Sequence, residues 1–229
     1  MPARPIRTEL LKGLYLILDP AASRGRPLTD VLAEAAEAGV RLFQYRDKSS
    51  PMREACREAV RLRQAAADAG ALLVVNDRCD LALAVDADGV HLGQDDLPLS
   101  LARAVLGPDK IIGISTHRAA DVREASEGGA DYIGYGPIYP TSTNPDHEPV
   151  VGIEGLRQIR PLTRLPVFAI GGITVDGAEA VLQAGADGMA VISAVLGAAD
   201  IRTAVREFMA RVDRASRRGS RLPGQEPSS

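Results

Sequence analysis

Three polar side chains of different chemistry alternate in the segment QYRDK at 44–48. Gln44, Arg46 and Lys48 stand two positions apart, so an extended chain projects them to the same side. They offer an amide, a planar guanidinium and a compact cation, a set that suits a polar heterocycle carrying a diphosphate. We predict a substrate-binding segment here and include Tyr45 and Asp47 in it. A salt-bridge cluster of Asp47 and neighbouring acids with these cations is the structural alternative.

Two carboxylates, Asp77 and Asp96, follow successive apolar runs, and Asp95 stands beside the second. Carboxylates that are brought together repel each other unless a cation or a proton intervenes. Magnesium typically takes one or two protein carboxylates, together with waters and substrate phosphate oxygens. We therefore predict Asp77 and Asp96 as Mg²⁺ ligands, with Asp95 as a possible substitute for Asp96. The alternative is that all three are helix caps or surface acids.

A regular scaffold must position these residues, and the chain shows its pattern. Short apolar runs alternate with segments of helical period, such as 27–39, 52–70, 119–129 and 176–185. The eight runs are 14–19, 41–46, 72–76, 89–92, 111–116, 132–136, 166–172 and 188–193. Continuous apolar strands separated by helices are typical of a parallel sheet whose faces are covered. Eight units in 229 residues predict the α/β class and a single (β/α)8 TIM barrel.

We expect the barrel domain to span 13–213. An N-terminal extension at 1–12 precedes it, and a disordered tail at 214–229, rich in Arg, Ser, Gly and Pro, follows it. In such barrels the functional groups lie at the carboxyl ends of the strands. The glycines at 171–172 and the pair Ile192 and Ser193 end the last two strands, where barrels commonly bind phosphate through backbone N–H groups. A tight turn would need the double glycine equally.

Composition limits the partners that the protein can have. A formal net charge of −3 and 3% aromatic residues, with no Trp, argue against a nucleic-acid surface. No apolar run approaches the about 18 residues of a membrane span, and 1–12 lacks the apolar region of a signal peptide. Cys56 and Cys79 lack the spacing of a zinc or redox motif. We expect a cytoplasmic protein that acts on small molecules, with homo-oligomer formation left open.

The chain resembles the thiamine phosphate synthase family from about Leu14 to about Phe208. The motifs are QYRDK at 44–48, NDRCDLALAVDADGVHLGQDD at 76–96, GISTH at 113–117, ADYIGYGPIYPTST at 130–143, AIGGI at 169–173 and AGADGMAVIS at 184–193. Each motif alone is modest, but their order across successive strands is specific. The resemblance implies a magnesium-dependent transferase that joins a pyrimidine diphosphate to a thiazole phosphate, giving thiamine monophosphate and pyrophosphate.

The resemblance also implies roles for individual residues. Gln44, Arg46, Lys48 and Asn76 are similar to the pocket for the aminopyrimidine and its diphosphate, and Ser115 resembles a hydroxyl that serves the same substrate. Asp77 and Asp96 look like the magnesium ligands. Among these residues, Arg46, Lys48 and Ser115 are the expected catalytic groups. The residues implied to hold the thiazole phosphate are Thr141, Thr143, Gly172, Ile192 and Ser193, and we include the loop neighbours Ser142 and Asn144 in the substrate-binding set.

One position departs from the family pattern. The family's threonine loop usually continues with lysine, whereas Asn144 follows Thr143 here. A cation is therefore missing where the pyrophosphate departs, and loss of one charge-assisted contact costs about 1.5–3 kcal/mol. His147 in the same loop is a candidate substitute when protonated, and a solvated loop residue otherwise.

Two other functions stay open at this stage. A thiazole tautomerase would share the barrel, would not need to bind a diphosphate, and would use His117 as an acid or base. A non-catalytic barrel that binds thiamine precursors would keep the pocket without turnover. The complete set of Asp77, Asp96, Lys48 and Arg46 favours the synthase over the tautomerase, because a tautomerase has little use for a metal and diphosphate site. Turnover with release of pyrophosphate is the observation that separates the synthase from the precursor-binding barrel.

Overall fold

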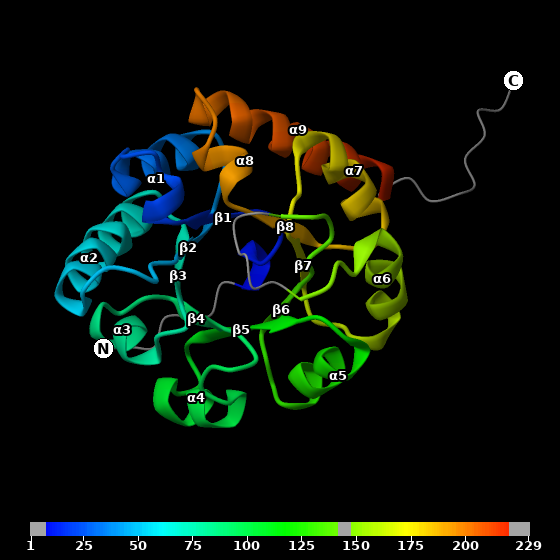
Figure 1. Cartoon of the computed structure of the whole chain (residues 1–229), viewed down its shortest axis with the longest axis horizontal. Helices are drawn as coiled ribbons and strands as arrows, with labels where there is room; N and C mark the ends of the chain where they lie inside the picture. The colour runs from blue at the N-terminus through cyan, green and yellow to red at the C-terminus, as the bar shows by residue number, and fades with distance from the viewer. Residues whose placement is uncertain (1–7, 142–147, 220–229) are drawn as a thin grey trace, which may run out of the picture.

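Eight parallel strands close into a barrel in the order of the sequence, as predicted. The structure is a computed structural model and describes residues 8–141 and 148–219. Figure 1 looks at the ring of strands with the helices arranged around it. The strands are β1 Gly13–Leu18, β2 Leu42–Tyr45, β3 Leu72–Asn76, β4 Gly89–Leu92, β5 Ile111–Thr116, β6 Tyr132–Tyr135, β7 Val167–Ile170 and β8 Gly188–Val191.

The helices cover the outside of the barrel and bury one stripe each. In α2, for example, Ala55, Ala59, Leu62 and Ala66 are buried at helical spacing. The helices are α1 Leu28–Glu37, α2 Met52–Asp68, α3 Cys79–Ala84, α4 Leu99–Leu106, α5 Ala119–Glu127, α6 Gly152–Ile159, α7 Val175–Gln183, α8 Ser193–Leu196 and α9 Ile201–Gly219. The short α8 follows β8 directly, and α9 packs against α1, α7 and β1, which completes the outer ring.

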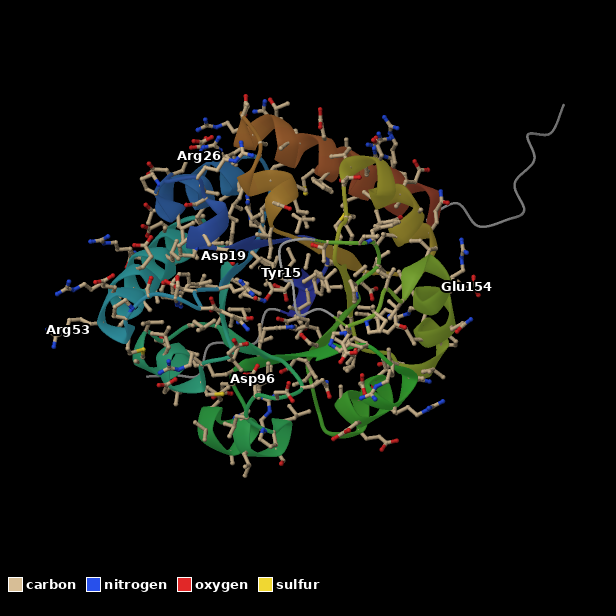
Figure 2. The ribbon with its side chains drawn as sticks, in the orientation of Figure 1. Tyr15, Asp19, Arg26, Arg53, Asp96 and Glu154 are labelled. Carbon is tan, nitrogen blue, oxygen red and sulfur yellow. The ribbon has the colours of Figure 1, made fainter. Side chains whose placement is uncertain are left out.

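The apolar residues form two clusters on opposite faces of the strands. The larger lies between the strands and the helices, and includes Phe43 and Tyr45 of β2. The smaller fills the barrel interior, where the rings of Tyr15, Tyr132 and Phe168 meet edge to face. Figure 2 shows Tyr15 near the middle of the barrel. Neighbouring residues of one strand therefore serve different clusters, as the two-residue period of a strand requires.

The N-terminal extension contributes to the core, which corrects the prediction that the first dozen residues lie outside the barrel. Thr8–Leu10 form a 3-10 helix, and the following Leu11 is 3% exposed. Leu11 belongs to the interior cluster together with Leu42 and Leu72, which begin their strands. The extension thus closes the amino-terminal end of the barrel with an apolar side chain.

The predicted boundary at residue 213 is also wrong, because α9 continues to Gly219. The Arg-rich composition around residue 214 concealed a helix whose earlier part is anchored by the buried Val205 and Phe208. The remainder of the predicted tail lies outside the described residues. Over 8–141 and 148–219, no helix has the length and apolar character that a membrane crossing requires.

Candidate active site

The carboxyl ends of the strands surround a cavity of about 330 Å³ at the barrel mouth. It is lined by the polar residues that end β2 and β3 and by the loop after β4. All seven residues that the resemblance assigns to the pyrimidine diphosphate and the metal contribute to it, namely Gln44, Arg46, Lys48, Asn76, Asp77, Asp96 and Ser115. In Figure 2 the labelled Asp19 and Asp96 lie on the inner side of the helix ring, whereas Arg53 and Glu154 lie on its outside. The structure therefore brings the first half of the predicted site together.

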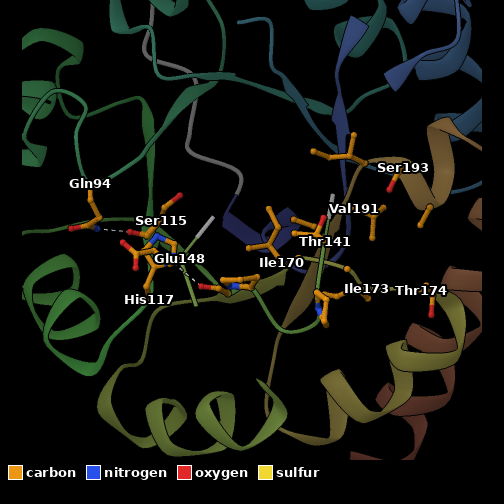
Figure 3. A pocket seen from close by; sticks show the side chains of 18 of the residues that line it. Gln94, Ser115, His117, Thr141, Glu148, Ile170, Ile173, Thr174, Val191 and Ser193 are labelled. Atoms are coloured by element: carbon orange, nitrogen blue, oxygen red, sulfur yellow. Dashed lines mark hydrogen bonds between the residues drawn. The ribbon is translucent and has the colours of Figure 1, made fainter. Parts of the chain in front are cut away.

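A second cavity of about 520 Å³ lies beside the first. The loops after β6, β7 and β8 form it, and Thr141, Gly172, Ile192 and Ser193 line it. Figure 3 shows Thr141 and Ser193 in this cavity, with Ile170 and Val191 beside them. These are the described members of the set predicted to hold the thiazole phosphate.

The two cavities share a wall. Seven residues line both, namely Gln94, Asp95, Ser115, His117, Ile170, Ala190 and Ile192. The side-chain amide of Gln94 donates a hydrogen bond of 2.5 Å to the backbone carbonyl of Ser115, which ties the loop after β4 to the end of β5 (Figure 3). Two ligands that occupy the two cavities would consequently meet along this wall.

Asp77 and Asp96 form an electrostatically costly pair. Burial raises the pKa of the Asp77 carboxyl, and a hydrogen bond and the negative charge from Asp96 raise it further, while Lys48 opposes them. The ammonium Nζ of Lys48 lies 3.5 Å from Oδ2 of Asp77, and its side chain is 59% exposed. Asp96 Oδ2 also accepts a hydrogen bond of 2.6 Å from the backbone N–H of Gly93. This pair needs a cation or a proton between its members.

The backbone at Asp77 is unusual in a way that fits a functional position. Its φ is +61°, in the left-handed region that aspartate tolerates better than most residues. The backbone N–H of Asp77 donates a hydrogen bond of 2.8 Å to the carbonyl of His91 on β4. The turn that aims this carboxylate is therefore fixed by the neighbouring strand.

Arg46 is held by Asp19, a residue that the sequence analysis did not select. Asp19 follows β1, is 5% exposed, and accepts a hydrogen bond of 2.5 Å from Nη1 of Arg46. The Arg46 side chain is 18% exposed and lines the cavity. Asp19 positions the cation and partly neutralises it.

A chain of polar side chains crosses the barrel interior at the bottom of the cavity, which all of them line. Gln44 Nε2 lies 2.8 Å from Tyr15 Oη, which lies 2.8 Å from Tyr132 Oη. Tyr132 Oη lies 2.9 Å from Nδ1 of His91, and Nε2 of His91 lies 3.0 Å from Oγ of Ser115. Burial lowers the pKa of His91 to about 4, so the ring is neutral near pH 7. Tyr15, His91 and Tyr132 were not among the predicted site residues, although each is a polar residue inside an otherwise apolar run.

His117 follows β5 and faces both cavities. Its Nδ1 lies 2.6 Å from the carbonyl oxygen of Gly136, so Nδ1 carries the hydrogen and Nε2 is left as an acceptor. Its backbone N–H donates a hydrogen bond of 3.0 Å to Asp121 at the start of α5, as expected of a residue next to a helix start. The loop after β6 thus orients the ring, and the start of α5 fixes the backbone of His117.

The double glycine after β7 has a steric reason. A Cβ on Gly172 would lie 2.4 Å from the carbonyl oxygen of Pro140, and one on Gly171 would lie 2.5 Å from Cβ of Pro137. Both glycines also have a positive φ, which is +94° at Gly171 and +63° at Gly172. The loop after β6 therefore packs directly against the backbone after β7, which leaves backbone groups at the cavity surface.

Two predicted residues are in the wrong place for substrate. Tyr45 belongs to the outer cluster and its hydroxyl donates a hydrogen bond of 2.9 Å to Asp47 Oδ2. Both line a separate groove beside α1 and α2 and neither lines the two cavities at the barrel mouth. The strand period explains the correction, because residues between Gln44, Arg46 and Lys48 face the helices. Ser142, Thr143, Asn144 and His147 lie outside the described residues, so the expectations for them stay predictions.

Comparisons with known proteins agree with this geometry. The chain is 47% identical over 199 residues to a thiamine-phosphate synthase of Chloroflexus aurantiacus, which covers 87% of this chain and 92% of the relative. It is 45% identical over 202 residues to a thiamine-phosphate synthase of Moorella thermoacetica, over 88% of this chain and 96% of the relative. A solved thiamine phosphate pyrophosphorylase from Pyrococcus furiosus superposes with a TM-score of 0.81 at 42% identity, covering 90% of this chain and 97% of that one. The family model described as thiamine monophosphate synthase matches residues 14–195, and the chain belongs to this family.

Proposed function

We propose that this protein is a thiamine phosphate synthase that joins an aminopyrimidine diphosphate to a thiazole phosphate. The observation that supports this most directly is the pair of cavities with a common wall at the barrel mouth. One has the cations and paired carboxylates that a diphosphate requires, and the other has the hydroxyls and glycine backbone that suit a single phosphate. Two phosphorylated substrates that react with each other need such an arrangement.

The first cavity would bind the pyrimidine diphosphate. Gln44 and Asn76 offer amide groups to the heterocycle, and Arg46 and Lys48 offer positive charge to the diphosphate. Lys48 is exposed and flexible enough to follow the leaving group, whereas Arg46 is fixed by Asp19. The negative charge that develops on pyrophosphate would be stabilised by both cations.

Asp77 and Asp96 fit a magnesium ion by the chemistry of their side chains. Burial and the neighbouring Asp96 carboxylate raise the pKa of Asp77, and a bound cation would relieve this repulsion. Among the described residues no group of three or more His, Cys, Asp or Glu could hold a metal, so a bound ion would complete its shell with water and substrate phosphate oxygens. That is the usual coordination of Mg²⁺, and when bound it supplies charge neutralisation for the departing diphosphate.

The second cavity would bind the thiazole phosphate. The loops after β7 and β8 and the short α8 occupy the place where (β/α)8 barrels commonly hold phosphate. Gly172, Ile192 and Ser193 offer backbone N–H groups there, and Thr141 and Ser193 offer hydroxyls. The thiazole ring would then face the shared wall at Ser115 and His117.

The reaction needs no nucleophile from the protein. The bond between the pyrimidine methylene carbon and the diphosphate oxygen breaks, and its electron pair leaves with pyrophosphate. The lone pair of the thiazole nitrogen forms the new bond to the same carbon. The electron-rich aminopyrimidine can delocalise positive charge at that carbon, so the task of the site is to orient both rings, exclude water and stabilise the leaving group.

The test is turnover by the purified full chain with both substrates and Mg²⁺. We expect thiamine monophosphate and pyrophosphate in equal amounts, and loss of both when the metal is chelated. Isomerisation of a thiazole carboxylate phosphate without pyrophosphate release would show a tautomerase instead. Binding of both substrates without any product would show a precursor-binding barrel. The cytoplasmic location and the possible homo-oligomer stay predictions from the sequence.

A further inference from the structure

The polar chain across the barrel interior links two residues that face the first cavity. Gln44 stands at one end and Ser115 at the other, with Tyr15, Tyr132 and His91 between them. We call these five side chains the interior relay. The four distances of 2.8, 2.8, 2.9 and 3.0 Å are all those of good hydrogen bonds. Gln44 is 2% exposed, Tyr15 1%, Tyr132 0% and His91 9%, so water cannot substitute for a missing partner along most of its length.

Counting hydrogens gives the relay a direction. The Gln44 amide donates to Tyr15 Oη. If Tyr15 then donates to Tyr132, and Tyr132 donates to Nδ1 of His91, every buried hydroxyl hydrogen has an acceptor. If Tyr132 instead donates to Tyr15, the hydrogen of Tyr15 has no acceptor among the described residues. Buried hydroxyl groups are rarely left in that state, so the first direction is favoured.

The direction determines the tautomer of His91. A neutral imidazole has one donor and one acceptor nitrogen. Because Nδ1 accepts from Tyr132, Nε2 carries the hydrogen and donates to Oγ of Ser115. The hydrogen of Ser115 is then free to point into the cavity. At the other end, the Gln44 nitrogen is engaged, and its carbonyl oxygen is the group left for a ligand.

The packing of the barrel keeps the relay in place. A Cβ on Gly113 would lie 2.0 Å from Cζ of Tyr132, and one on Gly134 would lie 3.2 Å from Cε1 of His91. The His91 and Tyr132 rings stack with centroids 5.4 Å apart. Two strands thus omit side chains at the positions where the two rings need space, and the rings have little freedom to reorient.

We propose that the interior relay has a fixed direction, which makes Ser115 a hydrogen-bond donor and the Gln44 carbonyl an acceptor toward the bound aminopyrimidine, with Tyr132 and His91 as positioning residues. The ligand identity rests on the proposed function, whereas the direction of the relay does not. An aminopyrimidine offers both matching groups, because its ring nitrogens accept and its exocyclic amine donates. A heterocycle without an amine next to a ring nitrogen would leave one end of the relay unpaired.

The direction is measured on the ligand-free full chain by ¹⁵N NMR of imidazole nitrogens, since the chain has only three histidines. We expect the Nε2–H tautomer for His91 and the Nδ1–H tautomer for His117, with assignment through His117→Gln. The Nδ1–H tautomer at His91 in the wild-type protein would overturn the proposal. This measurement needs no turnover, so it stands even if the proposed function fails.

A matched pair of variants tests whether Tyr132 sets the His91 tautomer that donates to Ser115. Tyr132→Phe removes the donor to His91, and we expect a mixture of His91 tautomers. Tyr15→Phe removes the same hydroxyl from a neighbouring ring but leaves the Tyr132 donor in place, and we expect the His91 tautomer to be unchanged. If both variants lose the Nε2–H tautomer of His91 to the same extent, or if neither variant changes it, the assigned direction of the relay is contradicted.

The functional readout is a double-mutant cycle. Tyr132→Phe should lower kcat/KM for the pyrimidine diphosphate about tenfold in the wild-type background, the size expected for one hydrogen bond to a charged or polarised ligand. In the Ser115→Ala background, Tyr132→Phe should lower kcat/KM little further, because the Ser115 hydroxyl through which Tyr132 acts is already absent. Additive effects would show that Tyr132 acts only through the fold, and unfolding curves of each variant provide the control for stability.

Discussion

Gly113→Ala should be unusually destabilising for a glycine-to-alanine change in a strand. The added Cβ would lie 2.0 Å from Cζ of Tyr132 and 2.4 Å from its Oη, whereas ordinary contact begins at 3.4 Å. The ring must therefore withdraw by about 1.4 Å (3.4 − 2.0). Its hydrogen bonds to Tyr15 and His91 are 2.8 and 2.9 Å long, so a shift of that size is large enough to break them.

The expected loss of folding free energy in Gly113→Ala follows from these contacts. Overpacking costs about 1–3 kcal/mol, and each buried polar group that loses its partner costs about 1–3 kcal/mol more. The lower entropy of the unfolded chain returns about 0.4–1 kcal/mol. We expect a net loss of about 3–6 kcal/mol, which lowers Tm by about 6–24 °C at about 2–4 °C per kcal/mol for a chain of this size.

Thermal and denaturant unfolding of the full chain measure this loss. Gly134→Ala is the matched control, because Gly134 also faces the barrel interior and lies on the neighbouring strand β6. Its Cβ would lie 3.2 Å from His91 Cε1, so a shift of a few tenths of an ångström suffices. We expect Gly134→Ala to stay within about 1 kcal/mol of the wild type. A Gly113→Ala protein as stable as this control would refute the packing argument.

Three further changes probe the rim. Asp77→Asn should abolish both Mg²⁺-dependent turnover and the stabilisation of the fold by Mg²⁺, which is about 2.7 kcal/mol at a hundredfold excess over Kd and is measured as a rise in Tm. The exposed Asp80→Asn should keep both. Asp19→Asn should raise KM for the pyrimidine diphosphate about tenfold, since its arginine partner loses its anchor, and an unchanged KM would argue against that role. Burial opposes ionisation of Asp121, but hydrogen bonds from His117 and Arg118 lower its pKa. Its folded pKa lies below the unfolded value, so its stabilisation is present at neutral pH and lost as pH falls through the acid range. Asp121→Asn should therefore destabilise the protein by about 1 kcal/mol at pH 7 and by less in acid, as unfolding curves at both pH values would show.

Much of the fold was predictable because buried parallel strands have a simple sequence pattern. The run at 89–92 coincides with β4, and the helical segment at 52–70 contains α2 Met52–Asp68. The ends of the chain were less predictable, because composition dominated the interpretation there. Leu10 and Leu11 form only a short apolar pair, too short to predict an element, and Leu11 is buried because it packs at the end of the barrel interior. The helix α9 continues past residue 213 because its earlier turns are anchored, although the Arg-rich sequence beyond them resembles a tail.

The candidate site was predictable where residue type and strand position agreed. Gln44 and Arg46 face the cavity, as their spacing predicts, and the same period turns Tyr45 away from it. Pairings between strands were not predictable, because no local spacing links Asp19 to Arg46 or Tyr132 to His91. A search for polar residues at inward positions along each strand would have found the interior relay, since such residues stand out in apolar runs.

The interior relay also indicates that the barrel core serves ligand binding as well as stability. Interiors of (β/α)8 barrels are usually filled by branched aliphatic residues, which need no hydrogen-bond partners. Replacing a buried polar network by apolar side chains of similar volume is often neutral or stabilising, whereas removing one member is costly. A chain selected for stability alone would therefore gain little from Tyr15, His91 and Tyr132 at its centre. Their presence is explained by the cavity where an aminopyrimidine would bind, because these three residues line it together with Gln44 and Ser115, the two ends of the relay.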